Sequence, residues 1–406
     1  MRIAIQEWMR TPGVTAVFEA LSDGVTRFVG GCVRDTLLDR PIRDIDIATD
    51  LEPRAVMARA GQAGIKAVPT GIEHGTITLV AKGQPVEVTT LRRDVETDGR
   101  RAVVAFTRDW REDALRRDFT MNAMSMDRDG AVHDYFGGIE DARAGRVRFV
   151  GEAEERIRED VLRILRFFRF HAHYGRGEPD EAGYAACVKL AHMLPSLSGE
   201  RIRQELLRLL EADDPIPSLE RMSAAGIWPE IGIPDVDLPT LAAFIRLEGQ
   251  TTDPVPRLAA LLGGGIDVDT VAAVLRLSGK EASLLRGVRD LARDAPPPAD
   301  EVGAYLYRHG ADRARCAGHL ALARSDGKDG SDAEDWRIVV SAADKWMPKS
   351  FPIRGRDLLD AGMAPGEQIG VLLNTVEDWW VRSGFEPDRA DCLAYARSLI
   401  TKTGNA

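Results

Sequence analysis

The sequence predicts a multidomain α+β chain, in which an α/β part with a mixed sheet of about five strands precedes a mostly all-α part. Between residue 28 and about residue 150, short β-rich runs (IDIAT, GTITLVAK, PVEVTTLR, AVVAFT, RVRFV) alternate with glycine turns and one helical stretch. After Gly151 the apolar residues recur at helical spacing, in short segments separated by Gly and Pro. With 406 residues, the chain is too long for one typical core.

The composition excludes several classes of protein. Hydrophobic residues make up 44% of the chain and charged residues 29%, as is typical of a globular protein. No run of about 18 apolar residues occurs and the N-terminus does not resemble a secretory signal, so we expect no membrane association. The four cysteines are far apart and form no C-x-x-C pair, which argues against a zinc site or disulfide framework and favours the cytoplasm.

Shifts in composition predict four parts. They are an α/β head (1–148), a helical neck (149–210), a helical body (211–330) and a helical tail (331–406). The net charge of −10 is unusual for a nucleic-acid binder. Arginines nevertheless gather between residues 92 and 176, while the acidic runs come later, so the basic character is local.

Two aspartates, Asp44 and Asp46, lie one residue apart in a predicted strand. Residues i and i+2 of a strand point to the same face, so both carboxylates converge there. Two such close carboxylates repel each other unless a cation lies between them, and Mg²⁺ suits such a site. Glu87, facing outward on a neighbouring predicted strand, would supply a third acid. Three acids with two metal ions would serve in-line phosphoryl transfer.

A glycine turn, GGCVRD, precedes the aspartates and leads into a predicted helix. The free N–H groups at a helix start attract phosphate, Gly31 would allow close backbone approach, and Arg34 would add a charged contact. Taken alone, the D-x-D is also typical of a solvated edge strand, and the G-G of an ordinary turn. Their combination at this spacing favours a site for phosphates and metal.

A later helical stretch, REDVLRILRFFRF, carries Asp160, Arg163, Arg166 and Arg169 at intervals of three. Such a band is also typical of a solvated face with ion pairs. Its alternative function is base recognition: a carboxylate accepts from the exocyclic amine of cytosine or adenine while a guanidinium donates to the ring nitrogen. Uracil and guanine have a carbonyl in place of the amine and an N–H donor in place of the ring-nitrogen acceptor, so both contacts fail. Asp160 and Arg163 would thus select C and A.

The segment GG-x-VRD-x-LL followed by D-x-D-x-x-T, ending at Thr49, resembles the head-domain signature of the class II tRNA nucleotidyltransferase and bacterial poly(A) polymerase family. The segment RRDFTMNA (116–123) is similar to a second block of that family. The resemblance implies a nucleotidyltransferase head with Mg²⁺ held by Asp44 and Asp46. It also implies that Arg117 and Asp118 contact the nucleotide.

For the neck, the resemblance implies that EDVLR is a protein template that selects CTP and then ATP. Arg166 and Arg169 match further nucleotide contacts of the family. The later helices would bind the acceptor arm of tRNA through shape and phosphates. The implied activity is template-independent addition of CCA to the tRNA 3′ end, with release of pyrophosphate.

Secondary features favour CCA addition over poly(A) synthesis. PTGIEHGTITLV (69–80) is similar to the tRNA branch, and RRDVETDGR (92–100) resembles the flexible loop of enzymes that complete the whole CCA end. Three alternatives stay open: a poly(A) polymerase, a partial enzyme that adds only CC or only A, and a non-catalytic RNA-binding relative.

Overall fold

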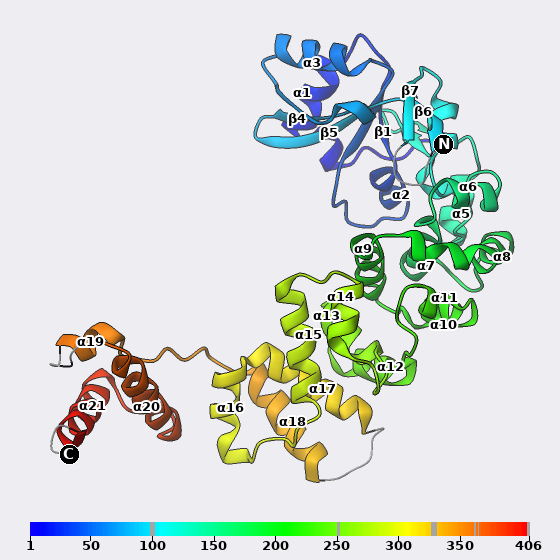
Figure 1. Ribbon diagram of the computed structural model, residues 1–406. Helices are drawn as coiled ribbons and strands as arrows, with labels where there is room; N and C mark the ends of the chain where they lie inside the picture. The colour runs from blue at the N-terminus through cyan, green and yellow to red at the C-terminus, as the bar shows by residue number, and fades with distance from the viewer. Residues whose placement is uncertain (98–101, 250–251, 326–330, 361–362, 364, 404–406) are drawn as a thin grey trace. The chain divides into compact units, whose positions relative to one another are not determined.

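The computed structural model describes residues 1–97, 102–249, 252–325, 331–360, 363 and 365–403 (Figure 1). The chain divides into two units: residues 1–235 with 274–276, and residues 236–273 with 277–406. The finer division at residues 148, 210 and 330 stays a prediction. Among the described residues, no helix is both long enough and apolar enough to cross a membrane.

The first unit begins with the sheet and its covering helices. In chain order its elements are η1 (Glu7–Arg10), α1 (Pro12–Ala20), β1 (Thr26–Val29), α2 (Gly31–Leu37), β2 (Asp46–Thr49), α3 (Pro53–Gln62), β3 (Lys66–Gly71), η2 (Ile72–His74), β4 (Thr76–Ala81), β5 (Gln84–Thr90), β6 (Arg92–Thr97), β7 (Ala102–Phe106), α4 (Trp110–Leu115), η3 (Thr120–Asn122), β8 (Ser125–Met126), β9 (Val132–His133) and α5 (Gly138–Ala144).

The unit continues as helices alone: α6 (Ala153–Glu159), α7 (Arg163–Tyr174), α8 (Glu181–Leu190), η4 (Ala191–Ser196), α9 (Gly199–Leu210), α10 (Ile216–Ala224) and α11 (Ile227–Glu230).

The main sheet has seven strands within the described ranges, in the order β3-β4-β5-β2-β1-β8-β9. It is mixed, because β2 pairs in parallel with β5 while the other neighbours are antiparallel. This sheet and the helices after it confirm the predicted fold class. Four strands of this sheet, β1, β3, β8 and β9, were not predicted, and β1, β8 and β9 are too short to show a clear alternation in sequence. The predicted strand AVVAFT is β7 and lies outside this sheet.

Two predicted segments differ from the structure. RVRFV (146–150) is no sheet strand; it only joins the 118–120 segment, through bonds from Thr120 N to Arg148 O and from Val150 N to Asp118 O. A β-rich pattern shows that a segment can be extended, not that a sheet edge is open to it. The predicted loop 92–100 instead contains β6, which pairs with β7 in a separate two-stranded sheet, and residues 98–100 lie outside the described residues.

The sheet core follows from strand periodicity. In β5, Val86 and Val88 are buried while Glu87 between them is exposed, as the alternation predicts. In the neighbouring strands β1 and β2, Phe28 and Ile47 are fully buried and face each other across the pair. Helices α1 and α3 pack against β3, β4 and β5 (Figure 1).

An aromatic cluster joins α7 to the segment before η3. The ring of Phe119 lies 5.0 Å from that of Phe149 and 4.9 Å from that of Phe170, and Phe149 stacks on Phe167 at 5.6 Å. All four rings are buried. Because aromatic pairs contribute beyond their buried area, this cluster holds the arginine-bearing helix firmly against the sheet part of the same unit.

The second unit is helical in its described residues. Its elements are α12 (Leu238–Leu247), α13 (Pro254–Leu261), α14 (Val268–Val274), α15 (Gly279–Leu291), η5 (Ala299–Glu301), α16 (Val302–His309), α17 (Ala311–Arg324), α18 (Ser331–Asp344), α19 (Gly355–Asp360), α20 (Gln368–Arg382) and α21 (Arg389–Thr403).

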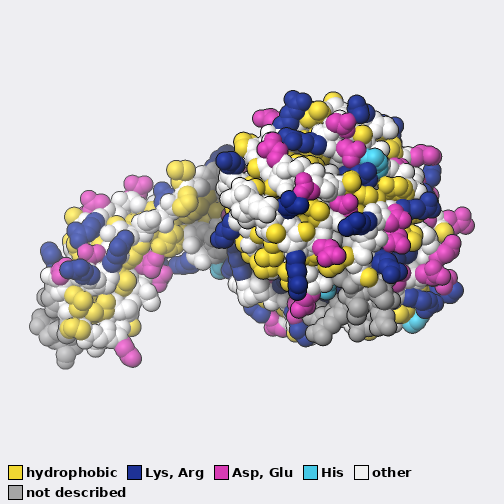
Figure 2. All heavy atoms as spheres, turned by 90° about the horizontal axis from the view of Figure 1, so that it is seen from above, with side chains coloured by type: hydrophobic (Ala, Val, Ile, Leu, Met, Phe, Trp, Pro, Cys, Tyr) yellow, Lys and Arg dark blue, Asp and Glu magenta, His cyan; other side chains and the backbone are white. Residues whose placement is uncertain are grey.

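Basic and acidic side chains are interspersed over the face drawn in Figure 2. Many arginines from the basic part of the sequence are paired with acids inside the first unit, namely Arg116 and Arg117 with Asp113, Arg163 with Glu159, Arg166 with Asp118, and Arg169 with Glu205. The local excess of arginine is therefore largely neutralised by neighbouring carboxylates.

Candidate active site

Three carboxylates gather at one end of β2 and β5. Asp46 is the first residue of β2, and it lies directly beside Glu87 of β5 in the parallel register. Paired residues of adjacent strands project to the same face. Asp44 lies two residues before β2, so the prediction that both aspartates are in a strand is wrong for Asp44. The predicted proximity of Glu87 to the D-x-D is confirmed.

The three acids affect one another electrostatically. Burial raises the pKa of Asp46, with Arg117 acting in the opposite direction and Asp44 adding to the rise. Burial also raises the pKa of Glu87, and both Asp46 and Asp44 add to it. Carboxylates that raise one another's pKa form a cluster that a cation would relieve.

The chemistry of these donors fits a divalent cation, the cofactor that nucleotidyltransferases generally use. Within the described ranges, no three His, Cys, Asp or Glu side chains converge closely enough to hold a metal by themselves. Mg²⁺ does not need such a protein cage, since it binds through one or two carboxylates and completes its octahedron with water and substrate phosphate. Asp44 and Asp46 suit this mode.

The glycine turn lies beside Asp46. β1 and β2 are antiparallel with Phe28 opposite Ile47, so the residues after Val29 meet the start of β2. The thiol of Cys32 bonds to the Asp46 carbonyl at 3.7 Å. The predicted adjacency of turn and aspartates is confirmed. A helix and a return loop fill the interval between them.

Gly30 has the backbone that only glycine adopts readily, and the predicted close approach of phosphate to Gly31 stays a prediction. The φ of Gly30 is 70° and its ψ is −126°, and an added Cβ would lie 3.1 Å from Nη1 of Arg117. Gly31 is the first residue of α2, and its Cβ would lie an ordinary 3.6 Å from Nη2 of Arg34. Two adjacent glycines do not reveal in sequence which of them takes the strained conformation.

We expect different results from alanine at the two glycines. G30A should destabilise the protein by about 1–3 kcal/mol, because alanine at this backbone conformation is strained and crowds Arg117. G31A should be neutral or stabilise by up to about 1 kcal/mol. If phosphates approach Gly31, G31A should nevertheless raise the KM for CTP. Urea unfolding and initial rates measure both. Equal unfolding free energies for the two variants would contradict the assignment to Gly30.

Arg34 is buried and its guanidinium is already bonded. It donates to both Asp35 oxygens at 2.9 Å, to Asn122 Oδ1 at 2.5 Å and to the Tyr174 hydroxyl at 2.6 Å. Its carbon Cζ lies 4.0 Å from the Tyr174 ring centre. A direct phosphate contact from Arg34 would have to replace some of these bonds. The guanidinium already links α2, the block 116–123 and the end of α7.

Arg117 is better placed than Arg34 to meet a phosphate. Its Nη1 donates to the Asn122 carbonyl at 3.3 Å and its Nη2 lies 3.3 Å from Asp113 Oδ2. It borders Gly30, and its charge lowers the pKa of Asp46, so it lies between the glycine turn and the carboxylates. Its side chain is 20% exposed. A phosphate at the glycine turn would come within reach of this charge.

Asp118 is buried and bonded to α7. Its Oδ1 accepts from the Phe119 amide at 2.8 Å and from Asn122 Nδ2 at 2.9 Å, while its Oδ2 accepts from Arg166 Nε at 2.9 Å. Burial alone would raise its pKa, but Arg166 and these bonds hold the pKa well below its ordinary value. Asp118 therefore connects the sheet part of the unit to the arginine-bearing helix.

The stretch 158–170 is not one helix. α6 ends at Glu159 and α7 begins at Arg163, and Asp160 between them is extended, with φ −150° and ψ 104°. Its Oδ1 accepts from the Leu162 amide at 3.2 Å. Aspartate competes with helical bonding by accepting from nearby amides, which breaks the predicted helix at this residue. Asp160 and Arg163 consequently do not share one helix face.

Arg163, the first residue of α7, is fixed by carbonyls. Its Nη1 donates to the Arg156 carbonyl at 2.7 Å and to Glu159 Oε2 at 2.7 Å, and its Nη2 donates to the Arg116 carbonyl at 3.1 Å. These bonds use three of the five guanidinium donors, so two can still serve a base.

Arg166 and Arg169 are both paired with acids. Arg166 pairs with Asp118 and lies 3.6 Å from Glu205 Oε1, and Arg169 Nε lies 2.7 Å from Glu205 Oε2. Burial lowers the pKa of Arg169 to about 10, although Glu205 acts in the opposite direction. Both arginines hold α7 against α9 and the block 116–123, and direct nucleotide contact by either stays a prediction.

Sequence reasoning missed two residues of α9. Arg201 donates to Asp160, and Glu205 one turn later forms an ion pair with Arg169 and lies near Arg166. Both residues lie in the segment SGERIRQEL. Its signal was an arginine and a glutamate at positions i and i+4, on one face of an amphipathic helix.

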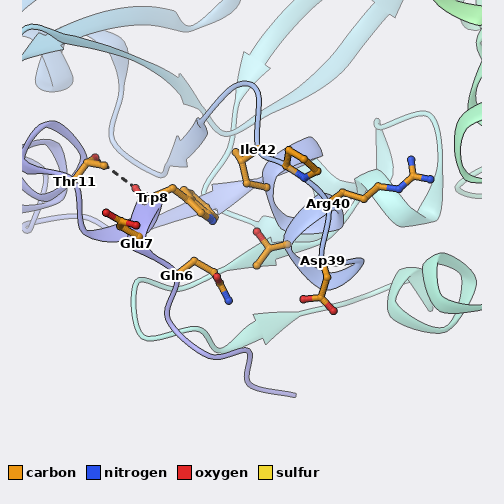
Figure 3. A pocket seen from close by; sticks show the side chains of 9 residues that line it. Gln6, Glu7, Trp8, Thr11, Asp39, Arg40 and Ile42 are labelled. Atoms are coloured by element: carbon orange, nitrogen blue, oxygen red, sulfur yellow. Dashed lines mark hydrogen bonds between the residues drawn. The ribbon is translucent and has the colours of Figure 1, made fainter. Parts of the chain in front are cut away.

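A cavity of about 620 Å³ lies between η1 and the loop after α2, beside the segment that leads to Asp44 (Figure 3). Gln6, Trp8, Asp39, Arg40 and Ile42 are among its lining residues. The Thr11 hydroxyl donates to the Trp8 carbonyl at its rim, at 3.4 Å. None of the predicted site residues lines this cavity.

A mixed sheet with clustered carboxylates, a glycine turn beside them and a helical remainder defines the nucleotidyltransferase class. Residues 26–148 match the model of the poly A polymerase head domain, and residues 178–237 match that of the probable RNA and SrmB-binding site of polymerase A. The chain belongs to the CCA-adding enzymes, the class II tRNA nucleotidyltransferases.

Similarity to individual members extends over most of the chain. The chain is 34% identical to the mitochondrial CCA tRNA nucleotidyltransferase 1 of Mus musculus, over 91% of this chain and 86% of the relative. It is 32% identical to the CCA-adding enzyme of Levilactobacillus brevis, over 91% and 92%. The structure of the Bacillus stearothermophilus CCA-adding enzyme in complex with CTP matches with a TM-score of 0.71 at 28% identity, over 97% of this chain and 98% of that chain.

Proposed function

We propose that this protein adds CCA to the 3′ end of tRNA from CTP and ATP, without a nucleic-acid template. One observation supports this most directly: the segment 160–169 is bonded to the block 116–123. Arg163 donates to the Arg116 carbonyl and Arg166 to Asp118, while Arg117 between them borders the glycine turn and Asp46. Groups able to read a base and groups able to hold a triphosphate thus belong to one bonded assembly.

In the proposed reaction, the tRNA 3′-hydroxyl attacks the α-phosphorus and pyrophosphate leaves. Asp44 and Asp46 would hold two Mg²⁺ ions, with Glu87 as a third acid. When bound, the ions would neutralise the phosphates and polarise the reacting oxygens. The glycine turn and Arg117 would fix the triphosphate. Catalysis of this kind depends on positioning and charge neutralisation.

Asp160 and Arg163 are proposed to read the base. Asp160 would accept from the amine of cytosine or adenine, and Arg163 would donate to the ring nitrogen through its remaining donors. Uracil and guanine would leave both groups unpaired, at about 1–3 kcal/mol for each lost contact. Both residues are partly exposed, so a base can reach them.

The later helices are proposed to bind the tRNA acceptor arm by shape and phosphates. We also propose a cytoplasmic location, in which free cysteines such as the buried Cys32, Cys187 and Cys392 stay reduced. The vertebrate relatives are mitochondrial proteins, and cell fractionation of the source organism would decide between the compartments.

The deciding experiment incubates the protein with tRNA that lacks its 3′ end, with CTP and ATP together and separately, and sequences the products. We expect CC with CTP alone and CCA with both nucleotides. No incorporation of C would indicate a poly(A) polymerase. A product that stops at CC, or addition of A alone to tRNA ending in CC, would indicate a partial enzyme. No addition under any condition would indicate a non-catalytic relative.

A further inference from the structure

The carboxylate of Asp160 is held from α9. Nη2 of Arg201 lies 2.9 Å from Oδ1 and 2.9 Å from Oδ2 of Asp160, and the Leu162 amide donates to Oδ1 at 3.2 Å. The side chains of Arg201 and Asp160 are each 29% exposed. The bond is therefore partly open to solvent and does not lie in the core.

The bonding leaves one oxygen better able to accept than the other. A carboxylate has about four acceptor positions, two on each oxygen. Oδ1 already accepts from Arg201 and from the Leu162 amide, whereas Oδ2 accepts from Arg201 alone among the described bonds. An incoming amine therefore finds its acceptor at Oδ2, in a direction that Arg201 sets.

The same helix fixes the neighbouring arginines. Glu205 lies four residues after Arg201, on the same face of α9, and pairs with Arg169 at 2.7 Å. Ile202 and Leu206 of α9 are buried, and α9 packs against α7. α9 therefore holds Arg201 in a fixed position, from which Arg201 can orient Asp160, a residue with an extended backbone.

We propose that Arg201 is a positioning residue that determines base specificity through Asp160. This inference rests on the proposed reading of the base by Asp160. Because Asp160 lies between two helices, no helical turn fixes its side chain, and Arg201 supplies that constraint. A fixed acceptor repels the carbonyl of uracil or guanine. An acceptor free to rotate away repels it less, so loss of Arg201 weakens discrimination as well as binding.

The test compares R201M with R201K, D160N and the control R221M. Arg221 pairs at the surface with Glu178 in the same unit, so R221M matches the substitution without touching Asp160. The measurement is kcat/KM for CTP and for UTP in single-nucleotide addition, with the melting temperature of each variant. If R201M does not fold, R201Q replaces it in the same comparison.

We expect R201M to lower the ratio of kcat/KM for CTP over UTP by about tenfold, chiefly through the CTP value. R201K should restore most of the ratio, because a single nitrogen of Arg201 makes both contacts and a lysine nitrogen can replace it. R221M should leave the ratio unchanged. If Arg201 had only a structural role, R201M would lower kcat/KM for CTP and for UTP equally, and the loss would parallel the fall in melting temperature.

Three results would overturn the inference. If D160N lowers the ratio and R201M does not, Asp160 reads the base without help from Arg201. If R201M raises kcat/KM for CTP, Arg201 competes with the base for Asp160 instead of orienting it. If D160N itself leaves the ratio unchanged, base reading by Asp160 is wrong and the role of Arg201 fails with it. The outcome with D160N therefore separates the two failures.

Discussion

Replacing Asp46 with asparagine should lower nucleotide addition by about 10³-fold or more, because the metal would lose a ligand that supplies several kcal/mol of charge stabilisation. The same change should not destabilise the metal-free protein. Burial and Asp44 raise the pKa of Asp46, so its charged form costs folding free energy at neutral pH. Asparagine removes that cost while keeping the shape of the side chain.

Two measurements check this expectation. Single-turnover addition of C gives the catalytic loss. Thermal unfolding with and without Mg²⁺ measures how far metal binding stabilises the fold. Mg²⁺ at a hundredfold excess over Kd should stabilise the wild type by about 2.7 kcal/mol and leave the stability of D46N unchanged. The control is D129N, because Asp129 pairs with Arg2 at the exposed surface of the same unit. Full activity in D46N would rule out Asp46 as the metal ligand.

Replacing Asp118 with alanine should lower the free energy of unfolding by about 3 kcal/mol, the lower end for breaking a buried ion pair. The loss leaves Arg166 without its main partner and removes the acceptor of the Phe119 amide and Asn122. We choose the lower end because the Arg166 side chain is 28% exposed and keeps some solvation. Urea unfolding at pH 7 measures the change.

The pH dependence gives a second check on Asp118. Its pKa in the folded protein lies below the unfolded value, which is about 3.9. Its charge therefore stabilises the fold fully above pH 3.9, and this contribution is lost as the pH falls through the folded pKa. The deficit of D118N relative to the wild type should be equal at pH 7 and pH 5 and smaller at pH 3.

The control for Asp118 is E178A, which removes an exposed ion pair with Arg221 and should cost no more than about 1 kcal/mol. If D118A costs no more than E178A, Asp118 does not stabilise the junction with α7.

Short-range rules predicted the acidic end of the site well. The period of two placed Val86 and Val88 inside and Glu87 outside, and it predicted Glu87 close to the D-x-D. The rule did not reveal that β2 begins only at Asp46, because the ends of strands depend on neighbours that the local pattern does not contain. The sequence also did not reveal the positive φ of Gly30, because both residues are glycines and only the path of β1 decides which one takes it.

The arginine-bearing stretch was harder to predict. Its apolar period is helical from residue 153 onward, and the break at Asp160 depends on one side chain that accepts from the Leu162 amide. The roles of Arg166 and Arg169 depend on Asp118 and Glu205, which are 48 and 36 residues away in sequence. Contacts over such separations have no local signature. The class II resemblance nevertheless directed attention to the segment that the structure bonds to the block 116–123.

The position of Asp160 between two helices also affects what a substitution there would do to the fold. A residue inside a helix contributes to the stability of that helix, so its replacement is constrained by helix propensity and packing. Asp160 lies between α6 and α7, where neither helix depends on its backbone being helical. If Asp160 reads the base as proposed, substitutions there would change nucleotide preference, at the cost of its bonds to Arg201 and to the Leu162 amide. Such a substitution would leave the helical bonds within α6 and α7 in place, because Asp160 lies outside both helices.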